Sequence, residues 1–430
     1  MDKRMARVNA QDLRAGMVLA TDAKNTQGRL LLPRGLVLED QHIRVLALWG
    51  VIDVDIENVT REEARRAMLE AMDPTCVETA RNHVNILFSQ ADTGSAPMGE
   101  LRDLCVKLYA QRFHEGERVL VPGGIQTVSH GPAVSATARK DSPIVRRAFL
   151  PASADEFVRM DQSLASFPCV YFQLLDALEN PQSTAAQLAE IIAHDPNMSA
   201  RLLRLVNSPL YGFGQRVDSL SRGVVLVGAR DLTQLALGVA VLGEFVSVPD
   251  GVITVREVWR RSVARAVISR AIASHMPDME QERCFLVGLL RDIGRLVMLK
   301  LAPDDLAEAI VRSQDRGASM SRVEKEMFGF DHVDVASSLF QLWRLPDSLL
   351  PEAVLREHPQ VGGDTKREAA VCALAGTMAA AMGYGFTGTA YVRTLREGLW
   401  QTLELPESVM EVAFSTSARQ ISDVFAAFLG

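Results

Sequence analysis

The stretch that most constrains the fold runs from Ala185 to Gly228, where apolar residues at helical spacing alternate with fixed turn signals. The spacing predicts three short helices, the third of which starts near Ser219. Their apolar positions are Leu188, Ile191, Ile192, Leu202, Leu203, Leu205, Val206, Leu220, Val224 and Val225. Ordinary amphipathic helices do not need so many turn signals, so the stretch predicts a compact, all-helical unit.

The turn signals in this stretch have physical roles. The Asp-Pro pair at position 195 separates the first two helices, because proline disfavours helical geometry in the residue before it. Asn207 and Ser208 end the second helix, and we expect their side chains to satisfy backbone groups there. We interpret the following residues as structural rather than catalytic: Asp195, Pro196, Asn207, Ser208, Pro209 and Gly228.

The sequence HDPNMSARLLRLVNSPLYGFGQRVDSLSRGVVLVGARDL, which starts at His194, resembles the signature of bacterial HDOD domains. The elements DP, VNS and VGARDL occur in order at compatible spacings, and the resemblance spans roughly Phe157 to Gly388. HDOD domains are all-helical relatives of the HD phosphohydrolases and are regarded as signalling modules that lack the catalytic metal site. The resemblance therefore implies a mainly α protein, built on an all-helical HD-like bundle.

The chain divides into four segments. Residues 1–59 predict a small β-rich domain, and the sequence from Leu13 resembles a domain found ahead of some HDOD and HD-GYP proteins. Residues 60–114 predict a helical segment. Residues 115–156, rich in Gly, Pro, Ser and Ala, predict a linker. Residues 157–430 predict the HDOD-like helical domain with its C-terminal helices.

The resemblance also locates a degenerate site. HD phosphohydrolases bind a divalent metal through a His, a His-Asp pair and a distant Asp, and the metal activates a water to attack phosphorus. The pair falls in GLLRDIG, residues Gly288 to Gly294, where Asp292 remains and Arg291 replaces the His. The first His falls on Arg261 and the last Asp on Gly376. Arginine stays protonated and has no lone pair to give, so the resemblance implies a site without metal or other cofactor.

Two histidines, His332 in GFDHVDVA and His358 in REHPQ, fall where the family often keeps histidines. They are candidates for a polar pocket beside Asp292, and the alternative is local capping or hydrogen bonding. Arg261 and Arg291 stand in a place shaped for phosphates, which a guanidinium can bind bidentately. The alternative for these arginines is an internal ion pair with Asp292 or another carboxylate.

Composition bounds the partners and the compartment. The chain of 430 residues carries a net charge of −7, which gives no general attraction to nucleic acid or to an anionic membrane. Its 5 cysteines show no CxxC spacing, so reduced thiols are expected. We find no signal-peptide core, and no uninterrupted apolar run approaches about 18 residues. These features predict a cytoplasmic protein without a membrane span.

The first two helices of the stretch have the proportions of a helix-turn-helix, a motif that many DNA-binding proteins use. A recognition helix needs exposed polar residues for base edges and phosphates. The second helix offers mainly Arg201 and Arg204, and its Leu and Val content indicates burial. The sequence does not favour specific DNA binding.

The sequence favours a non-catalytic regulatory or scaffold protein of bacterial signalling, a pseudoenzyme that acts through protein partners. One alternative is a nucleotide or phosphate-ligand sensor that uses the degenerate pocket. Another is a metal-dependent phosphohydrolase or cyclic-nucleotide phosphodiesterase, which the missing ligands disfavour.

Overall fold

The structure of the protein is a computed structural model. It describes residues 5–10, 13–24, 29–49, 51, 53–58, 60–117, 119, 151–165, 167, 169–180, 182–245, 253–385, 391–406 and 408–429, so most of the predicted 115–156 linker lies outside the described residues. The chain forms two compact units. The first unit comprises Met1–Ile86, Gly94–Val121 and Glu407–Thr416, and the second comprises Leu87–Thr93, Pro122–Pro406 and Ser417–Gly430.

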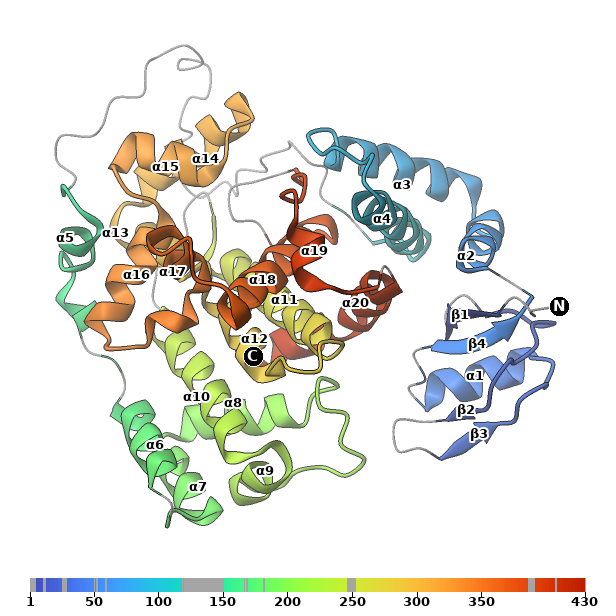
Figure 1. The fold of residues 1–430 in the computed structure, drawn as a ribbon, viewed down its shortest axis with the longest axis horizontal. Coiled ribbons are helices and arrows are strands. Elements are labelled where there is room, and N and C mark those ends of the chain that lie inside the picture. Colours follow the sequence, from blue (N-terminus) through green and yellow to red (C-terminus); the bar gives the residue numbers. More distant parts are fainter. Residues whose placement is uncertain are drawn as a thin grey trace. The chain divides into compact units, whose positions relative to one another are not determined.

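The strands lie in the first unit, where they form two antiparallel pairs (Figure 1). Strand β1 (Met5–Asn9) pairs with β4 (Asp53–Glu57), and β2 (Ala23–Lys24) pairs with β3 (Leu30–Leu32). Helix α1 (Asp40–Leu48) completes the small domain. Buried side chains from these elements and from the segments between them form one apolar core, which includes Val8, Leu19, Leu38, Leu46, Val54 and Ile56.

Three helices follow in the same unit: α2 (Arg61–Glu70), α3 (Pro74–Leu87) and α4 (Ala96–His114). Thr60 and Glu63 form a capping box at the start of α2, which satisfies two backbone donors that the helix itself leaves free. Arg65 on α2 is buried and pairs with Glu100 on α4 at 2.6 Å. The ion pair joins two helices of the predicted 60–114 segment.

The second unit is helical. It opens with α5 (Ala154–Val158), whose N-cap Ser153 lies inside the predicted 115–156 linker, so helical structure begins three residues before the predicted domain start. Its further helices are α6 (Cys169–Glu179), α7 (Ala185–Ala193), α8 (Pro196–Val206), α9 (Leu220–Val227), α10 (Ala229–Glu244), α11 (Val255–Ala273), α12 (Gln281–Leu290), α13 (Ile293–Leu301), α14 (Pro303–Arg316), α15 (Met320–Phe328), α16 (His332–Leu342), α17 (Pro351–Glu357), α18 (Gly363–Ala381) and α19 (Leu399–Leu403). The last helix, α20 (Ser408–Leu429), belongs to the first unit up to Thr416 and to the second unit from Ser417. The prediction of a mainly α protein with a small strand-containing N-terminal region is confirmed.

The centre of the second unit is formed by α10, α11 and α12. Every residue of α10 from Leu235 to Leu242 is buried, in keeping with its apolar sequence. Gly238 on α10 lets α12 approach closely, because an added Cβ would lie 2.8 Å from a methyl carbon of Leu289. Figure 1 shows α6, α7, α8 and α9 grouped at one end of α10. The stretch from Ala185 to Gly228, which forms α7, α8 and α9, therefore packs on the buried helix α10.

Among the described residues, no single helix is long and apolar enough to cross a membrane. Helices α9 and α10 together have the length and apolar composition of a membrane span, but they meet at an angle of 118°.

Candidate functional site

The site is built around Asp292, which lies between α12 and α13 and is fully buried. Three guanidinium groups surround its carboxylate. Arg291 Nη1 donates to Oδ1 at 2.7 Å, and Arg295 Nη1 donates to the same oxygen at 3.0 Å. Arg265 Nη1, from α11, lies 2.8 Å from Oδ2. Burial alone would raise the pKa of Asp292, but Arg265, Arg295 and Arg291 outweigh it and hold that pKa well below the usual value.

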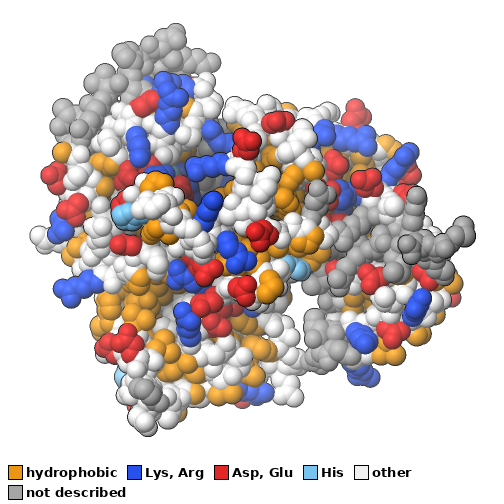
Figure 2. All heavy atoms as spheres, viewed as in Figure 1, with side chains coloured by type: hydrophobic (Ala, Val, Ile, Leu, Met, Phe, Trp, Pro, Cys, Tyr) orange, Lys and Arg blue, Asp and Glu red, His pale blue; other side chains and the backbone are white. Residues whose placement is uncertain are grey.

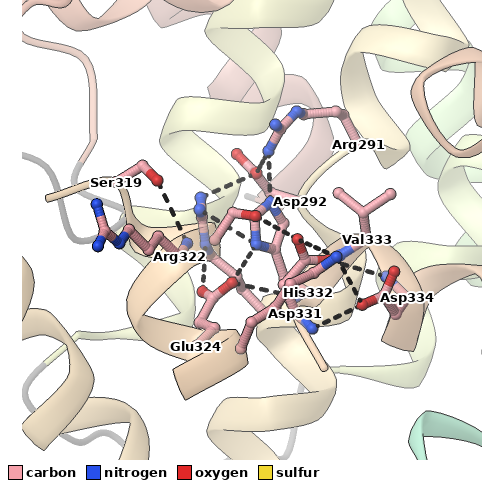
Figure 3. A network of polar contacts seen from close by, with 12 residues as sticks. Arg291, Asp292, Ser319, Arg322, Glu324, Asp331, His332, Val333 and Asp334 are labelled. Carbon is pink, nitrogen blue, oxygen red and sulfur yellow. Dashed lines mark hydrogen bonds and ion pairs between the residues drawn. The ribbon is translucent and has the colours of Figure 1, made fainter. Parts of the chain in front are cut away.

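Arg291 links Asp292 to His332, as Figure 3 shows, and also to Glu352. Its Nη1 also lies 2.7 Å from His332 Nε2, and its Nη2 lies 2.8 Å from Glu352 Oε2 on α17. A guanidinium has only donors, so His332 Nε2 must accept this hydrogen bond. The proton of the imidazole then lies on Nδ1, where it is donated to Glu324 Oε2. Both ring nitrogens of His332 are therefore engaged, and neither is left to bind a metal.

Glu324 on α15 closes the network on the other side of His332. Its Oε2 also accepts the backbone N–H of His332 at 3.1 Å, and its Oε1 lies 3.4 Å from Arg295 Nε. Burial would raise the pKa of this carboxyl, but His332 and Arg295 outweigh it and lower the pKa to about 2. Glu324 is therefore an anion at neutral pH although it is fully buried.

Next to this network, Asp331 caps the N-terminus of α16. Its Oδ1 accepts from the backbone N–H of Val333 at 2.9 Å and of Asp334 at 3.1 Å (Figure 3). Arg356 from α17 pairs with the same carboxylate at 2.8 Å. Burial would raise the pKa of Asp331, but the hydrogen bond from Ser321, the charge of Arg356 and the backbone N–H groups that the carboxylate accepts from hold it below the usual value. The cap fixes the first turn of the helix that carries His332.

A glycine positions the two halves of the site. Gly294 on α13 lies directly against the start of α16, because a Cβ there would come 1.8 Å from the carbonyl oxygen of His332. At position 294, a residue type with a side chain would not leave room for this approach of the two backbones. The short separation brings Asp292, two residues before Gly294, into the same cluster as His332.

The structure corrects one assignment from the sequence. Arg261 was placed at the first ligand position, but its Nη2 donates to the carbonyl oxygen of Gly385 at 2.7 Å. The arginine of α11 that faces Asp292 is Arg265, one helical turn later. Both arginines are buried and lie four residues apart, so they share a helix face and their sequence positions alone could not separate them.

Gly376 on α18 does lie beside the cluster. A Cβ at this position would be 3.0 Å from Arg265 Nε. An aspartate there would need the space that the guanidinium of Arg265 fills. Gly376 therefore leaves the room that the side chain of Arg265 occupies beside Asp292.

His358 does not belong to the cluster. Its side chain is exposed at the end of α17, whereas Asp292 and His332 are buried. The sequence missed four members of the network, Arg265, Arg295, Glu324 and Glu352. A usable signal was present for two of them, because Arg295 and Glu324 interrupt apolar helical stripes at buried positions.

The residues at the site do not fit the divalent metal of the HD phosphohydrolases. Three arginines face three carboxylates, Asp292, Glu324 and Glu352, and each of these carboxylates is already paired. His332 uses both ring nitrogens. Across the described parts of the chain, no group of three or more His, Cys, Asp or Glu side chains is arranged to hold a metal ion. The arrangement can hold its helices together, but it offers no open ligand position.

The turn residues of the α7 to α9 stretch have the local contacts that their types allow. Asp195 caps α8, and its Oδ1 accepts from the backbone N–H of Asn197 and Met198, with Pro196 in the first helical position. Asn207 Nδ2 donates to the carbonyl oxygens of Leu203 and Val217, and its Oδ1 accepts from the Val217 N–H at 2.7 Å. Asn207 therefore ties Val217, at the far end of the 208–217 loop, to the end of α8.

Two further turn residues complete this stretch. Ser208 Oγ accepts from the backbone N–H of Leu210 at 3.3 Å, across Pro209. Gly228 has a φ of +102°, which separates α9 from α10 and which residues with a side chain rarely adopt. The face of α8 differs slightly from the prediction, because Leu202, Leu205 and Val206 are buried and Leu203 is only half-buried.

The family model and one of the solved structures support the helical fold of the second unit. Residues 164–359 match the family model described as the HDOD domain. A solved HDOD domain protein of unknown function from Geobacter sulfurreducens is 20% identical with a TM-score of 0.51, and the match covers 64% of this chain and 95% of that one. A solved putative phosphohydrolase from Shewanella amazonensis is 24% identical with a TM-score of 0.43, covering 62% and 98% of the two chains.

A curated relative from Treponema pallidum (strain Nichols), an uncharacterized protein, is 23% identical over 188 residues. The match covers 44% of this chain and 36% of the relative, so this chain spans little more than a third of that protein's length.

Proposed function

We propose that this chain, which carries an HDOD domain over residues 164–359, is a non-catalytic signalling scaffold of the HD superfamily that acts through protein partners. One observation carries the proposal: Asp292, the single ligand that survives at the degenerate HD site, is fully buried among three guanidinium groups. An ion network occupies the place where a hydrolase would need open ligands.

The charge of the network argues against a bound divalent cation. Arg265, Arg291 and Arg295 carry permanent positive charges, and in a desolvated site their repulsion of a cation is little screened. Their carboxylate partners already neutralise them. A cation could enter only after these ion pairs were broken, and breaking a buried pair costs about 3–5 kcal/mol.

The same pairing weakens the phosphate-sensor alternative. A phosphate ligand would need guanidinium donors that are free to turn toward it. Arg291 is engaged by Asp292, His332 and Glu352, and Arg261 donates to Gly385. The arginines that the sequence offered to a phosphate are already bound to groups of the protein, which favours the scaffold.

Elemental analysis and turnover test the proposal. The purified full chain is expected to contain no stoichiometric manganese, iron, nickel or zinc. It is also expected to leave a cyclic dinucleotide and a generic phosphodiester uncleaved when each metal is supplied. Metal-dependent turnover that disappears in Asp292→Asn would contradict the proposal and support a phosphohydrolase.

The sensor alternative has its own measurement. Titration calorimetry with a cyclic dinucleotide and with inorganic phosphate is expected to show no binding. If either ligand bound tightly and Arg291→Gln abolished binding without changing the circular dichroism spectrum, the pocket would be a sensor. Arg316→Gln, which removes an exposed arginine paired with Glu326, is the matched control.

A further inference from the structure

Most arginines of the helical unit have a carboxylate partner. Arg283 pairs with Glu368, Arg312 with Glu308, and Arg316 with Glu326. Figure 2 shows the result on one face of the molecule, where acidic and basic side chains are interspersed. Such a surface has little net attraction for a charged partner.

The surface formed by α8, α9 and the loop between them differs. Residues 200–228 contain four arginines and one acidic residue, Asp218, a net charge of +3 in a chain of net charge −7. Among the described residues, none of the four arginines forms an ion pair with a carboxylate. These arginines are Arg201, Arg204, Arg216 and Arg222.

Hydrogen bonds tie α8, the loop and α9 together. Arg222 Nη2 donates to Gln215 Oε1 at 3.1 Å, which holds α9 against the loop beside the exposed Arg216. Val217, the next loop residue, is bonded twice to Asn207 at the end of α8. Asn207 lies one helical turn after Arg204, and both are exposed.

Apolar side chains lie in the same surface. Val225 is 73% exposed and Leu226 is 44% exposed, and Val225 has the largest exposure among the large hydrophobic side chains described. They follow Arg222 by three and four residues, so the three share one face of α9. The helix packs inward through Gly223 and Val224, which are buried. Folding therefore does not use the outer half of this apolar run, and paired exposed apolar residues commonly mark an interaction site.

We propose that the α8–α9 surface, defined by Arg201, Arg204, Arg216, Arg222, Val225 and Leu226, binds an acidic amphipathic helix of a partner protein. This inference rests on the proposed scaffold function and names the chemistry of its partner. A helix with leucines on one face would cover Val225 and Leu226, and flanking glutamates would meet the unpaired arginines. Nucleic acid fits less well, because it offers little to cover two exposed aliphatic side chains. The two aromatic rings of the loop, Tyr211 and Phe213, are half-buried and stacked on each other, which leaves them poorly placed for base stacking.

Fluorescence anisotropy with the full chain tests the surface. The probe is a labelled peptide of roughly 20 residues, with leucines at helical spacing and glutamates elsewhere. We expect saturable binding that weakens with added salt, since exposed charges are screened. Arg222→Glu and Val225→Glu are each expected to weaken binding about tenfold or more. Neither substitution removes a buried contact, and circular dichroism checks that both variants fold.

Matched controls separate this surface from charge and hydrophobicity in general. Arg44→Glu and Met160→Glu change an exposed arginine and an exposed methionine elsewhere, and neither is expected to change binding. A peptide with lysine in place of glutamate is expected not to bind. Equal weakening by the control substitutions would overturn the assignment to α8 and α9.

Other occupants would also overturn the proposal. A DNA duplex that binds while the acidic peptide does not would assign the surface to nucleic acid. Self-association of the free chain that is lost in Val225→Glu would assign it to a second copy. If the peptide does not bind, the assignment of the α8–α9 surface is wrong. The scaffold function is tested separately by the metal and turnover assays, so the two failures are distinguishable.

Discussion

The arginines around Asp292 and the arginines on the α8–α9 surface are the same residue type in opposite settings. The first group is held by buried carboxylates, and Asp292 itself has no exposed surface. The second group lies in or near solvent without an acidic partner among the described residues. The comparison teaches that an arginine at a degenerate site is not by itself a ligand-binding group, because its neighbours decide what its charge can still do.

The largest expected effect follows from removing the anion at the centre of the buried group. Asp292→Ala leaves three guanidinium groups without their shared carboxylate, and breaking a buried pair in this way costs about 3–5 kcal/mol of unfolding free energy. Urea unfolding followed by circular dichroism measures the loss. Asp218→Ala, on the exposed surface, is the control and is expected to change stability by less than about 0.5 kcal/mol. Equal losses would show that Asp292 is not the centre of the network.

The next largest loss of unfolding free energy is expected from changes in the apolar core under the exposed arginines of α8. Leu202 is fully buried, so Leu202→Ala is expected to cost about 2–5 kcal/mol. Leu203→Ala is expected to cost less, because its side chain is half-buried. Thermal unfolding of the two variants compares them directly. A larger loss for Leu203 would restore the helix face predicted from the sequence.

Acid distinguishes the two groups of arginines through their carboxylate partners. The pKa of Glu324 and that of Glu352 are each lowered to about 2 in the folded protein, below the usual value of 4.5. Between these values the unfolded chain binds more protons, so stability is present above about pH 4.5 and is lost as the pH falls toward 2. Glu324→Gln should flatten this loss. The measurement is the unfolding free energy at several pH values across that range. If it fell with pH equally steeply in Glu324→Gln and in the parent protein, the proposed role of Glu324 in the network would be contradicted.

The smallest effect is expected on the exposed surface. Arg204→Ala and Arg222→Ala remove no ion pair, so each should change unfolding free energy by less than about 0.5 kcal/mol. The same substitutions should weaken binding of the acidic peptide. Measuring unfolding free energy and peptide binding on the same preparations therefore separates a binding role of these arginines from a structural one. A large stability loss in Arg204→Ala would mean that its guanidinium has a structural partner.

Much of the helical fold could be predicted because its signals are local. The Asp-Pro pair at 195 does begin α8, since an aspartate cap and a proline in the first turn are properties of neighbouring residues. One short motif also pointed to Arg291 and Asp292, which are ion-paired in the structure, whereas their reading as a degenerate HD site stays a prediction. The resemblance of residues 1–59 to a domain ahead of HDOD and HD-GYP proteins stays a prediction.

The remaining site could not be predicted because its contacts join distant parts of the chain. Arg265 and Arg261 are both buried on α11, and only the packing of α12 and α13 shows which one meets Asp292. Glu352 reaches Arg291 from α17, 61 positions later in the sequence, with no local pattern to mark it. Leu203 was misassigned because the apolar run of α8 is wider than its buried face.

The contact between Gly294 and the carbonyl of His332 has a consequence for how such proteins can diverge. Helices α13 and α16 are brought together by backbone against backbone, so no bound cation is needed to hold Asp292 near His332. Side chains around the aspartate can then be exchanged while the helices keep their positions. In this fold, the backbone sets the distance between Asp292 and His332, whatever side chains surround them.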